Sequence, residues 1–333
     1  MDLSQLRVLF RVAAGPRVGF GHLVRCRSLA RAAGCAPLVS IRGSAATREA
    51  ASRGGWQVVD QPGDAALRAV GPDILVVDDP SGAAAARWVA RGRRAGVPVA
   101  AIHDLGLACV ESDLGVDGSV EPNHETRGRF GDLRGLSYAI LDPSVLFARS
   151  GRRAALDRVL IALGGGEHVH AMGDDLARAI VARQPWADVH IAAGFAVRQR
   201  PTGVTPGRWI EAPNGLASEL QAASLAIVAG GVTLYEACAI GTPAIAIALT
   251  PAQHTTIRAM AERGAVIDAG AAGDPRTLRR AADEAARLLV ERRAREGQSL
   301  IQRRLVDGRG AFRVADALRQ LRATVLPGVT HAA

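Results

Sequence analysis

The fold class follows most directly from residues 225–243, which read LAIVAGGVTLYEACAIGTP. The apolar run 225–228 predicts a short buried strand, and the two glycines that follow predict a tight turn into a helix over 233–240. Gly241-Thr242-Pro243 ends this helix and leads into a second apolar strand at 244–248. A strand, a glycine turn, a helix and another strand form the repeating unit of a parallel α/β sheet.

The same alternation runs through the rest of the chain. In the first half, strands are predicted at 8–12, 37–41, 57–59, 74–78 and 97–103, with helices at 22–33, 45–53, 64–70 and 82–94. In the second half, further strands are predicted at 159–163, 188–193, 209–211 and 265–267, with helices at 171–183, 216–223, 253–263 and 275–296. One or two further strands, including 137–141, are expected in the irregular stretch 109–153 that connects the halves.

These patterns predict an α/β protein with two Rossmann-like, doubly wound domains. A chain of 333 residues also exceeds the size at which one hydrophobic core usually keeps growing. We expect an N-terminal domain over 1–153 and a C-terminal domain over 154–333, with the last helix packing back on the N-terminal domain. Because ligands bind at the carboxyl ends of the strands in such sheets, two facing domains predict a ligand cleft.

The charge of the chain favours no specific nucleic-acid partner. The formal net charge is +9, and all 41 basic residues are arginines. Aromatic residues make up 4% of the chain and are not interleaved with the arginines, as a base-stacking surface would require. The arginines therefore predict a solvated surface, and some of them can attract an anionic nucleotide.

The cysteines and the hydropathy predict a soluble, cytoplasmic protein without metal or other cofactor. The four cysteines lack the paired short spacing of a zinc site and demand no disulfide. Asp2 precedes the first apolar segment, unlike a signal peptide, and no apolar run approaches the roughly 20 residues of a membrane span. The oligomeric state stays open.

The first candidate site follows the first strand. It comprises Arg11, the turn Gly19-Phe20-Gly21-His22, and Arg25. Glycines at a strand-to-helix turn allow a ligand to approach the backbone, and the new helix offers free N–H groups. Two interpretations of His22 remain open on these residues alone: a helix-start residue with a structural role, or a side chain that faces a ligand.

Two further glycine turns follow strands in the second half. Gly164 and Gly165 come directly after the strand at 159–163, where they suit either a phosphate or a simple tight turn. Gly230 and Gly231 follow the strand at 225–228, and Thr233 is placed to cap the next helix. That helix start can accept a pyrophosphate, while Glu236 can bind ribose hydroxyls and Gln253 can bind sugar hydroxyls.

Taken together, these motifs resemble those of a family. The segment 230–236 with Gly241-Thr242-Pro243 and Gln253 resembles the nucleotide-binding half of UDP-sugar enzymes of GT-B architecture. Within these, the chain looks most like the nucleotide-sugar hydrolases of pseudaminic acid biosynthesis (the PseG family) and related spore-coat polysaccharide proteins. The resemblance runs from Arg11 to about Leu321 through Gly19-x-Gly21-His22-x-x-Arg25, Val76-Val77-Asp78, Asp104-Leu105, Gly135-x-x-Tyr138-x-x-Leu141, Gly164-Gly165 and Asp307-Gly308-x-Gly310.

The resemblance implies hydrolysis of a UDP-linked amino sugar of the 2,4-diacetamido-2,4,6-trideoxy-hexose type. UDP and the free sugar would be released by C–O cleavage with inversion, and His22 would act as general base or orient the water. Three departures, Ala13, Pro80 and Ala252, fall on the sugar side. They keep two alternatives open: a UDP-sugar-dependent GT-B glycosyltransferase, or a catalytically silent nucleotide-sugar binding protein.

Other side chains have weaker interpretations. Asp104 is a cleft candidate that could orient a histidine or a sugar hydroxyl. Asp78-Asp79 reads as a solvated loop, with a carboxylate metal site as the less favoured alternative. His168 and His170 are expected to be a surface pair. Ser44 and Ser81 are expected to cap helices, and Cys26 to face the core.

Overall fold

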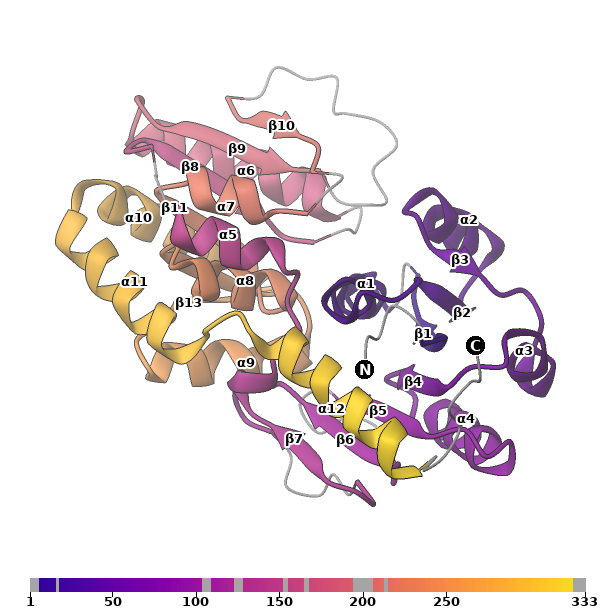
Figure 1. Cartoon of the computed structure of the whole chain (residues 1–333). Helices are drawn as coiled ribbons and strands as arrows, with labels where there is room; N and C mark the ends of the chain where they lie inside the picture. The colour runs from indigo at the N-terminus through magenta and orange to yellow at the C-terminus, as the bar shows by residue number, and fades with distance from the viewer. Residues whose placement is uncertain are drawn as a thin grey trace. The chain divides into compact units, whose positions relative to one another are not determined.

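The computed structural model of the chain describes residues 6–15, 18–103, 109–122, 128–151, 155–164, 168–193, 206–212 and 215–325 (Figure 1). It divides into two compact units: the first comprises Met1–Asp142 with Arg309–Ala333, and the second Pro143–Gly308. Among the described residues, no helix has both the length and the apolarity that crossing a membrane requires.

The first unit is built on a parallel sheet. The described strands follow the order β3-β2-β1-β4-β5-β6-β7. Between β1 and β4 the order changes direction, which makes this point the topological switch of the sheet. The strands are β1 (Val8–Ala13), β2 (Leu38–Arg42), β3 (Gln57–Val58), β4 (Ile74–Asp78), β5 (Val99–His103), β6 (Leu114–Asp117) and β7 (Asp132–Arg134).

Helices cover both faces of this sheet because its strands are apolar on both sides. On one face, Phe10 and Val12 of β1 pack in a core with α1 and α12; on the other, Leu9 packs in a core with α3 and α4. We call these the α1 face and the α4 face. The helical segments are α1 (Gly21–Ala33), α2 (Ala45–Arg53), α3 (Gly63–Val70), α4 (Gly82–Arg94), the 3₁₀ turn η2 (Leu136–Tyr138) and α12 (Gly310–Val325).

The second unit repeats the plan. Its described strands are parallel in the order β10-β9-β8-β11-β12-β13, so the switch point lies between β8 and β11. The strands are β8 (Arg158–Ala162), β9 (Asp188–Ala192), β10 (Arg208–Ile210), β11 (Leu225–Ala229), β12 (Ala244–Ala248) and β13 (Ile267–Ala271). The helices are α5 (Ser144–Ser150), α6 (His168–Arg183), α7 (Ala217–Ala222), α8 (Val232–Ile240), α9 (Pro251–Glu262), α10 (Arg276–Val290) and α11 (Arg292–Leu305).

The division between the units lies earlier in the chain than the predicted boundary at 153/154. α5 belongs to the second unit, where it packs on α7 and α8. Arg149 of α5 fixes this arrangement, because its guanidinium donates to the carbonyls of Ala239 at 2.6 Å and Arg303 at 2.8 Å. At the other end of the chain, α12 returns to the first unit and packs on α1.

The strand predicted at 137–141 is wrong. Its first residues form η2, and the Ser137 carbonyl accepts a hydrogen bond from Arg313 of α12 at 2.8 Å, so this backbone serves the last helix rather than the sheet edge. The sheet is instead extended by β6 and β7, which are short and carry aspartates, and whose sequences therefore lack a strand signal.

The single helix predicted at 275–296 is also wrong. The backbone leaves helical geometry at Glu291, with φ −85° and ψ 80°, which separates α10 from α11. Arg295 stabilises the break by donating to the carbonyls of Leu288 and Leu289 at the end of α10. The strand predicted at 265–267 lies later, as β13, next to a register shift in its pairing with β12.

Candidate functional site

The switch point of the first sheet brings His22 and Asp78 together. β1 and β4 are neighbours in the sheet, and in sheets of this kind ligands bind at the carboxyl ends of the strands that flank the switch point. His22 lies in the first turn of α1, the helix that follows β1, and Asp78 is the last residue of β4. The two side chains therefore meet where the fold alone predicts a site.

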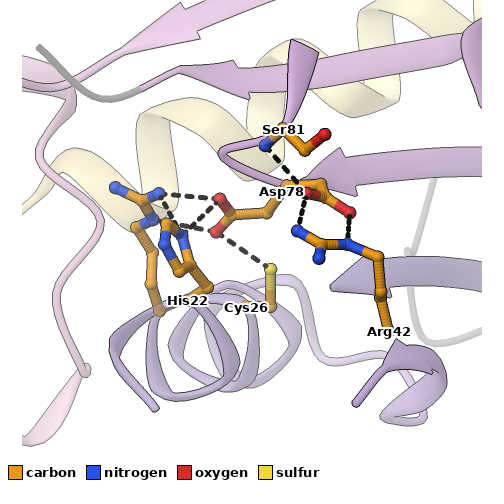
Figure 2. Close-up of polar contacts among 7 residues, drawn as sticks. His22, Cys26, Arg42, Asp78 and Ser81 are labelled. Carbon is orange, nitrogen blue, oxygen red and sulfur yellow. Dashed lines mark hydrogen bonds and ion pairs between the residues drawn. The ribbon is translucent and has the colours of Figure 1, made fainter. Parts of the chain in front are cut away.

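Asp78 binds three side chains of α1 (Figure 2). Its Oδ1 lies 2.8 Å from Nδ1 of His22. Arg25 donates to both carboxylate oxygens, from Nη2 to Oδ1 at 2.8 Å and from Nε to Oδ2 at 3.0 Å. The Cys26 thiol, at the end of a buried side chain, donates to Oδ2 at 3.6 Å. The Asp78 side chain is 1% exposed and that of His22 is 15% exposed, so a buried carboxylate holds a histidine that reaches solvent.

The charge of Asp78 assigns the tautomer of His22. Burial alone would raise the pKa of Asp78, but Arg25 and then His22 outweigh it and hold this pKa well below its ordinary value. Arg25 Nη2 also lies 3.2 Å from Nδ1 of His22, but the carboxylate contact is shorter, at 2.8 Å; because an ionised carboxylate only accepts hydrogen bonds, we assign the proton to Nδ1. A neutral ring then carries its lone pair at Nε2, which is the arrangement of a general base.

The turn before His22 leaves room for a ligand. Gly19 has φ +83°, a conformation that favours glycine, and its N–H donates to the Gly15 carbonyl at 2.7 Å. A side chain at Gly19 or Gly21 would meet nothing within 4 Å, and no side chain caps the first turn of α1. The substrate-binding role of the two glycines stays a prediction that this open space suits.

Arg25 joins His22, since its Nη2 lies 3.2 Å from Nδ1 of that ring, whereas Arg11 does not; their substrate-binding roles stay predictions. Arg25 is 9% exposed and holds Asp78 rather than open solvent. Arg11 points to the other face of the sheet, because successive residues of a strand alternate and its neighbours Phe10 and Val12 face α1. There its guanidinium lies 4.9 Å from the ring of Trp88 in α4 and donates to Ser40 Oγ at 3.3 Å.

Asp78 and Asp79 are buried, which corrects their assignment to a solvated loop. Asp79 follows the same alternation and turns to the α4 face, where Arg42 donates to both of its oxygens at 2.6 and 2.8 Å. The two carboxylates thus bind different arginines on opposite faces and do not share a metal. Within the described ranges, no group of three or more His, Cys, Asp or Glu side chains could hold a metal ion.

At the switch point of the second sheet, Gly230 and Gly231 connect β11 to α8. Gly230 is needed for packing, because a Cβ there would lie 2.9 Å from the Cβ of Gln253 and from Ile257. At Gly231 a Cβ would meet nothing within 4 Å, and α8 starts without a side-chain cap. The start of α8 thus combines free backbone donors with open space.

Of the three side chains expected to bind ligand near α8, one does not have its predicted position. Thr233 lies inside the helix, whose N-cap is Gly231, so its assignment as the cap is wrong. Glu236 is 7% exposed. Gln253 lies in the first turn of α9, and its Oε1 accepts the Leu249 N–H at 2.8 Å, which ties the end of β12 to that helix. Their contacts with nucleotide or sugar stay predictions.

Some of the remaining candidate residues lie in the described part of the chain and others do not. Gly164 has φ +95° after β8, on the other side of the second switch point, with open space around it. Asp104 and Gly165, like the side chains of His168 and His170, lie outside the described residues. Cys26 faces the core, and Ser44 caps α2 through the Thr47 N–H at 3.2 Å, as predicted. Ser81 precedes α4 but makes no side-chain cap.

Sequence reasoning missed Asp78 as a site residue. It assigned the task of orienting a histidine to Asp104, at the end of the next strand. What identifies Asp78 is the strand order: β4 lies beside β1, so a carboxylate at the end of β4 lies next to the helix that follows β1. The sequence alone does not reveal which strands are neighbours.

Comparisons with solved structures show that the chain has the GT-B fold. The spinosyn forosaminyltransferase SpnP matches 96% of this chain and 100% of its own, with TM-score 0.66 and 17% identity. The spinosyn rhamnosyltransferase SpnG complexed with thymidine diphosphate has TM-score 0.62 and 18% identity over 95% and 100% of the two chains. UDP-GlcNAc 2-epimerase from Neisseria meningitidis bound to UDP-GlcNAc has TM-score 0.63 and 10% identity over 95% and 100%.

Among curated proteins, the chain is similar to the spore coat polysaccharide biosynthesis protein SpsG of Bacillus subtilis (strain 168). The two are 29% identical over 216 residues, which is 62% of this chain and 63% of SpsG, so the similarity spans less than two thirds of the relative. No protein-family model matches the chain.

Proposed function

We propose that the chain transfers a sugar from a nucleotide sugar to a hydroxyl group of an acceptor, with His22 as the general base. The observation that carries this proposal is the His22–Asp78 pair at the switch point of a GT-B fold, since it supplies an oriented base at a ligand-binding edge. The glycosyltransferases of the same fold, including one with a bound nucleoside diphosphate, support transfer as the reaction class.

In the proposed reaction, Nε2 of His22 takes the proton of the acceptor hydroxyl. The acceptor oxygen forms a bond to the anomeric carbon while the bond from that carbon to the diphosphate oxygen breaks, and the nucleoside diphosphate leaves. The imidazolium that results is stabilised by the ionised Asp78, 2.8 Å from Nδ1. Because the pKa of Asp78 lies far below neutral, the carboxylate keeps its charge and does not take the proton.

We assign the nucleotide to the second unit. The start of α8 offers uncapped N–H groups next to the open space at Gly231, and a helix N-terminus stabilises a pyrophosphate. UDP is the nucleotide that the 230–236 segment indicates. A role in the biosynthesis of surface glycans is consistent with the similarity to SpsG, whose name refers to spore coat polysaccharide biosynthesis.

Hydrolysis is the second candidate, and the Gly19-x-Gly21-His22 turn favours it because it resembles that of the pseudaminic-acid hydrolases. The chemistry differs only in the nucleophile: His22 would deprotonate water, and the free sugar would leave with the nucleoside diphosphate. The same dyad can serve both reactions, so the products decide between them.

The test is a panel of UDP- and TDP-sugars, incubated with and without a set of hydroxyl acceptors and analysed for nucleoside diphosphate, free sugar and glycoside. Acceptor-dependent release with a new glycoside supports transfer; release of equimolar free sugar without acceptor supports hydrolysis. Nucleotide binding with no release from any sugar would contradict both.

His22→Asn tests the base directly. We expect kcat to fall about 10²–10⁴-fold, the usual contribution of general-base catalysis, with the Kd for the nucleoside diphosphate unchanged. His190→Asn is the matched control, because His190 also pairs with an aspartate, Asp188 at 3.0 Å, but within β9 of the second unit. Turnover by His22→Asn at the rate of the unmodified protein would remove His22 from this role.

A further inference from the structure

The α4 face of the first sheet holds a pocket of about 470 Å³ that the proposed reaction does not use. It is bounded by the ends of β1 and β2, the segment before α3, and one side of α4. Its lining includes five arginines: Arg11, Arg42, Arg48, Arg87 and Arg91. Among the described residues that line it, Asp60 is the only acidic one. Five arginines around one cavity create a positive potential that attracts anions.

The nearby carboxylates do not neutralise these charges. Arg42 pairs with Asp79, and Arg91 lies 3.2 Å from Asp64. Arg48 donates to the Gly43 carbonyl, and Arg87 has no acidic partner among the residues that the structure describes. Counting Asp60, Asp64 and Asp79 against the five arginines leaves two positive charges at the pocket.

The position of the Arg11 side chain is fixed by Trp88, which also lines the pocket. Its guanidinium stacks over Trp88, as does that of Arg91 at 5.4 Å, so one indole positions two like charges. The Arg11 Nε is buried and makes no hydrogen bond. Burial lowers the pKa of Arg11 to about 10; Asp79 opposes this, and Arg42, Arg91 and Arg87 add to it. A bound oxyanion would offset the repulsion that these arginines exert on Arg11.

We propose that this pocket binds the phosphate group of a phosphate monoester. The excess of two charges matches a doubly charged group, and forked guanidinium donors match its oxygens. Arg11, Arg48 and Arg87 supply donors that no carboxylate of the described residues occupies. The proposal is independent of the role of His22, which lies on the opposite face of the sheet.

The test titrates inorganic phosphate into the full-length protein by calorimetry and follows the rise of the unfolding temperature. We expect saturable binding that weakens with ionic strength, and acetate, with one charge, to bind at least about tenfold more weakly. Arg87→Gln alters an exposed side chain and Arg11→Gln a stacked one; each should weaken phosphate binding about tenfold or more.

Two control variants define the outcomes. Arg53→Gln removes an exposed arginine of the same unit outside the pocket and should leave phosphate binding unchanged, as should His22→Asn. Equal weakening by Arg53→Gln would show non-specific attraction and overturn the proposal, as would binding of acetate as tightly as phosphate or no saturation by phosphate. Phosphate binding that persists in a protein without glycosyl transfer would separate this site from the proposed function.

Discussion

Asp78 and Asp79 are consecutive in sequence, yet they serve opposite faces of the first sheet. On the α1 face, Asp78 meets one buried arginine and one histidine, and the ionised carboxylate balances the charge of Arg25. On the α4 face, Asp79 meets Arg42 beside further arginines, and positive charge remains. The same residue type thus balances its arginine on one side and only partly offsets a basic pocket on the other.

The charge of each site therefore depends on two things: which face of the sheet a strand residue points to, and which helices cover that face. β4 and the residue after it bring the two carboxylates to the same edge, and on the α1 face His22 of α1 meets the first of them. The α1 face is suited to moving a proton, and the α4 face to holding an anion. Changing each aspartate separately therefore tests the two faces independently.

The largest expected effect is on stability, from Asp78→Asn. This change removes the carboxylate charge from the buried ion pair with Arg25, and breaking such a pair costs about 3–5 kcal/mol. Asp79→Asn is the matched comparison: Asp79 is buried too, but the arginine that it leaves behind, Arg42, has a side chain that is 40% exposed and can be hydrated, so we expect the smaller loss, about 1 kcal/mol. Urea denaturation gives both unfolding free energies. Equal losses would show that the two faces do not differ as described.

Much of this arrangement could be predicted from the sequence, because apolar runs and helix caps act locally. The strand at 74–78 and the helices at 45–53 and 82–94 have the predicted bounds. By contrast, the pairing of His22 with Asp78 depends on β4 lying beside β1, a contact between residues far apart in the chain. Arg11 and His22 are separated because Arg11 points to the sheet face that α1 does not cover. The sequence shows that successive strand residues alternate, but not which face each helix covers.

The second prediction concerns acid. Because the folded-state pKa of Asp78 lies below its unfolded value, its contribution to stability is complete above about pH 4 and is lost as the pH falls further. The difference in unfolding free energy between the unmodified protein and Asp78→Asn should therefore shrink below pH 4, by up to about 1.4 kcal/mol per pH unit. Urea denaturation at pH 7, 5, 4 and 3 measures it, and a difference that stays constant to pH 3 would contradict the assigned ion pair.

The smallest expected effect concerns the Cys26 thiol, which adds a weak donor to Asp78 on the α1 face. Burial raises the pKa of this thiol, as does the negative charge of Asp78, so it stays protonated and can donate. Cys238 is equally buried, and burial alone raises its pKa. Changing each to Ala removes a sulfur from a core and should cost about 1 kcal/mol.

The loss for Cys26→Ala should exceed that for Cys238→Ala by about 0.5 kcal/mol, the low end for a net hydrogen bond. Repeating both changes in the Asp78→Asn background provides the double-mutant cycle. There the excess should vanish, because the acceptor charge is gone. If the excess persisted without the carboxylate, it would arise from packing around α1. The polar contacts of Asp78 that matter for stability would then be those with His22 and Arg25.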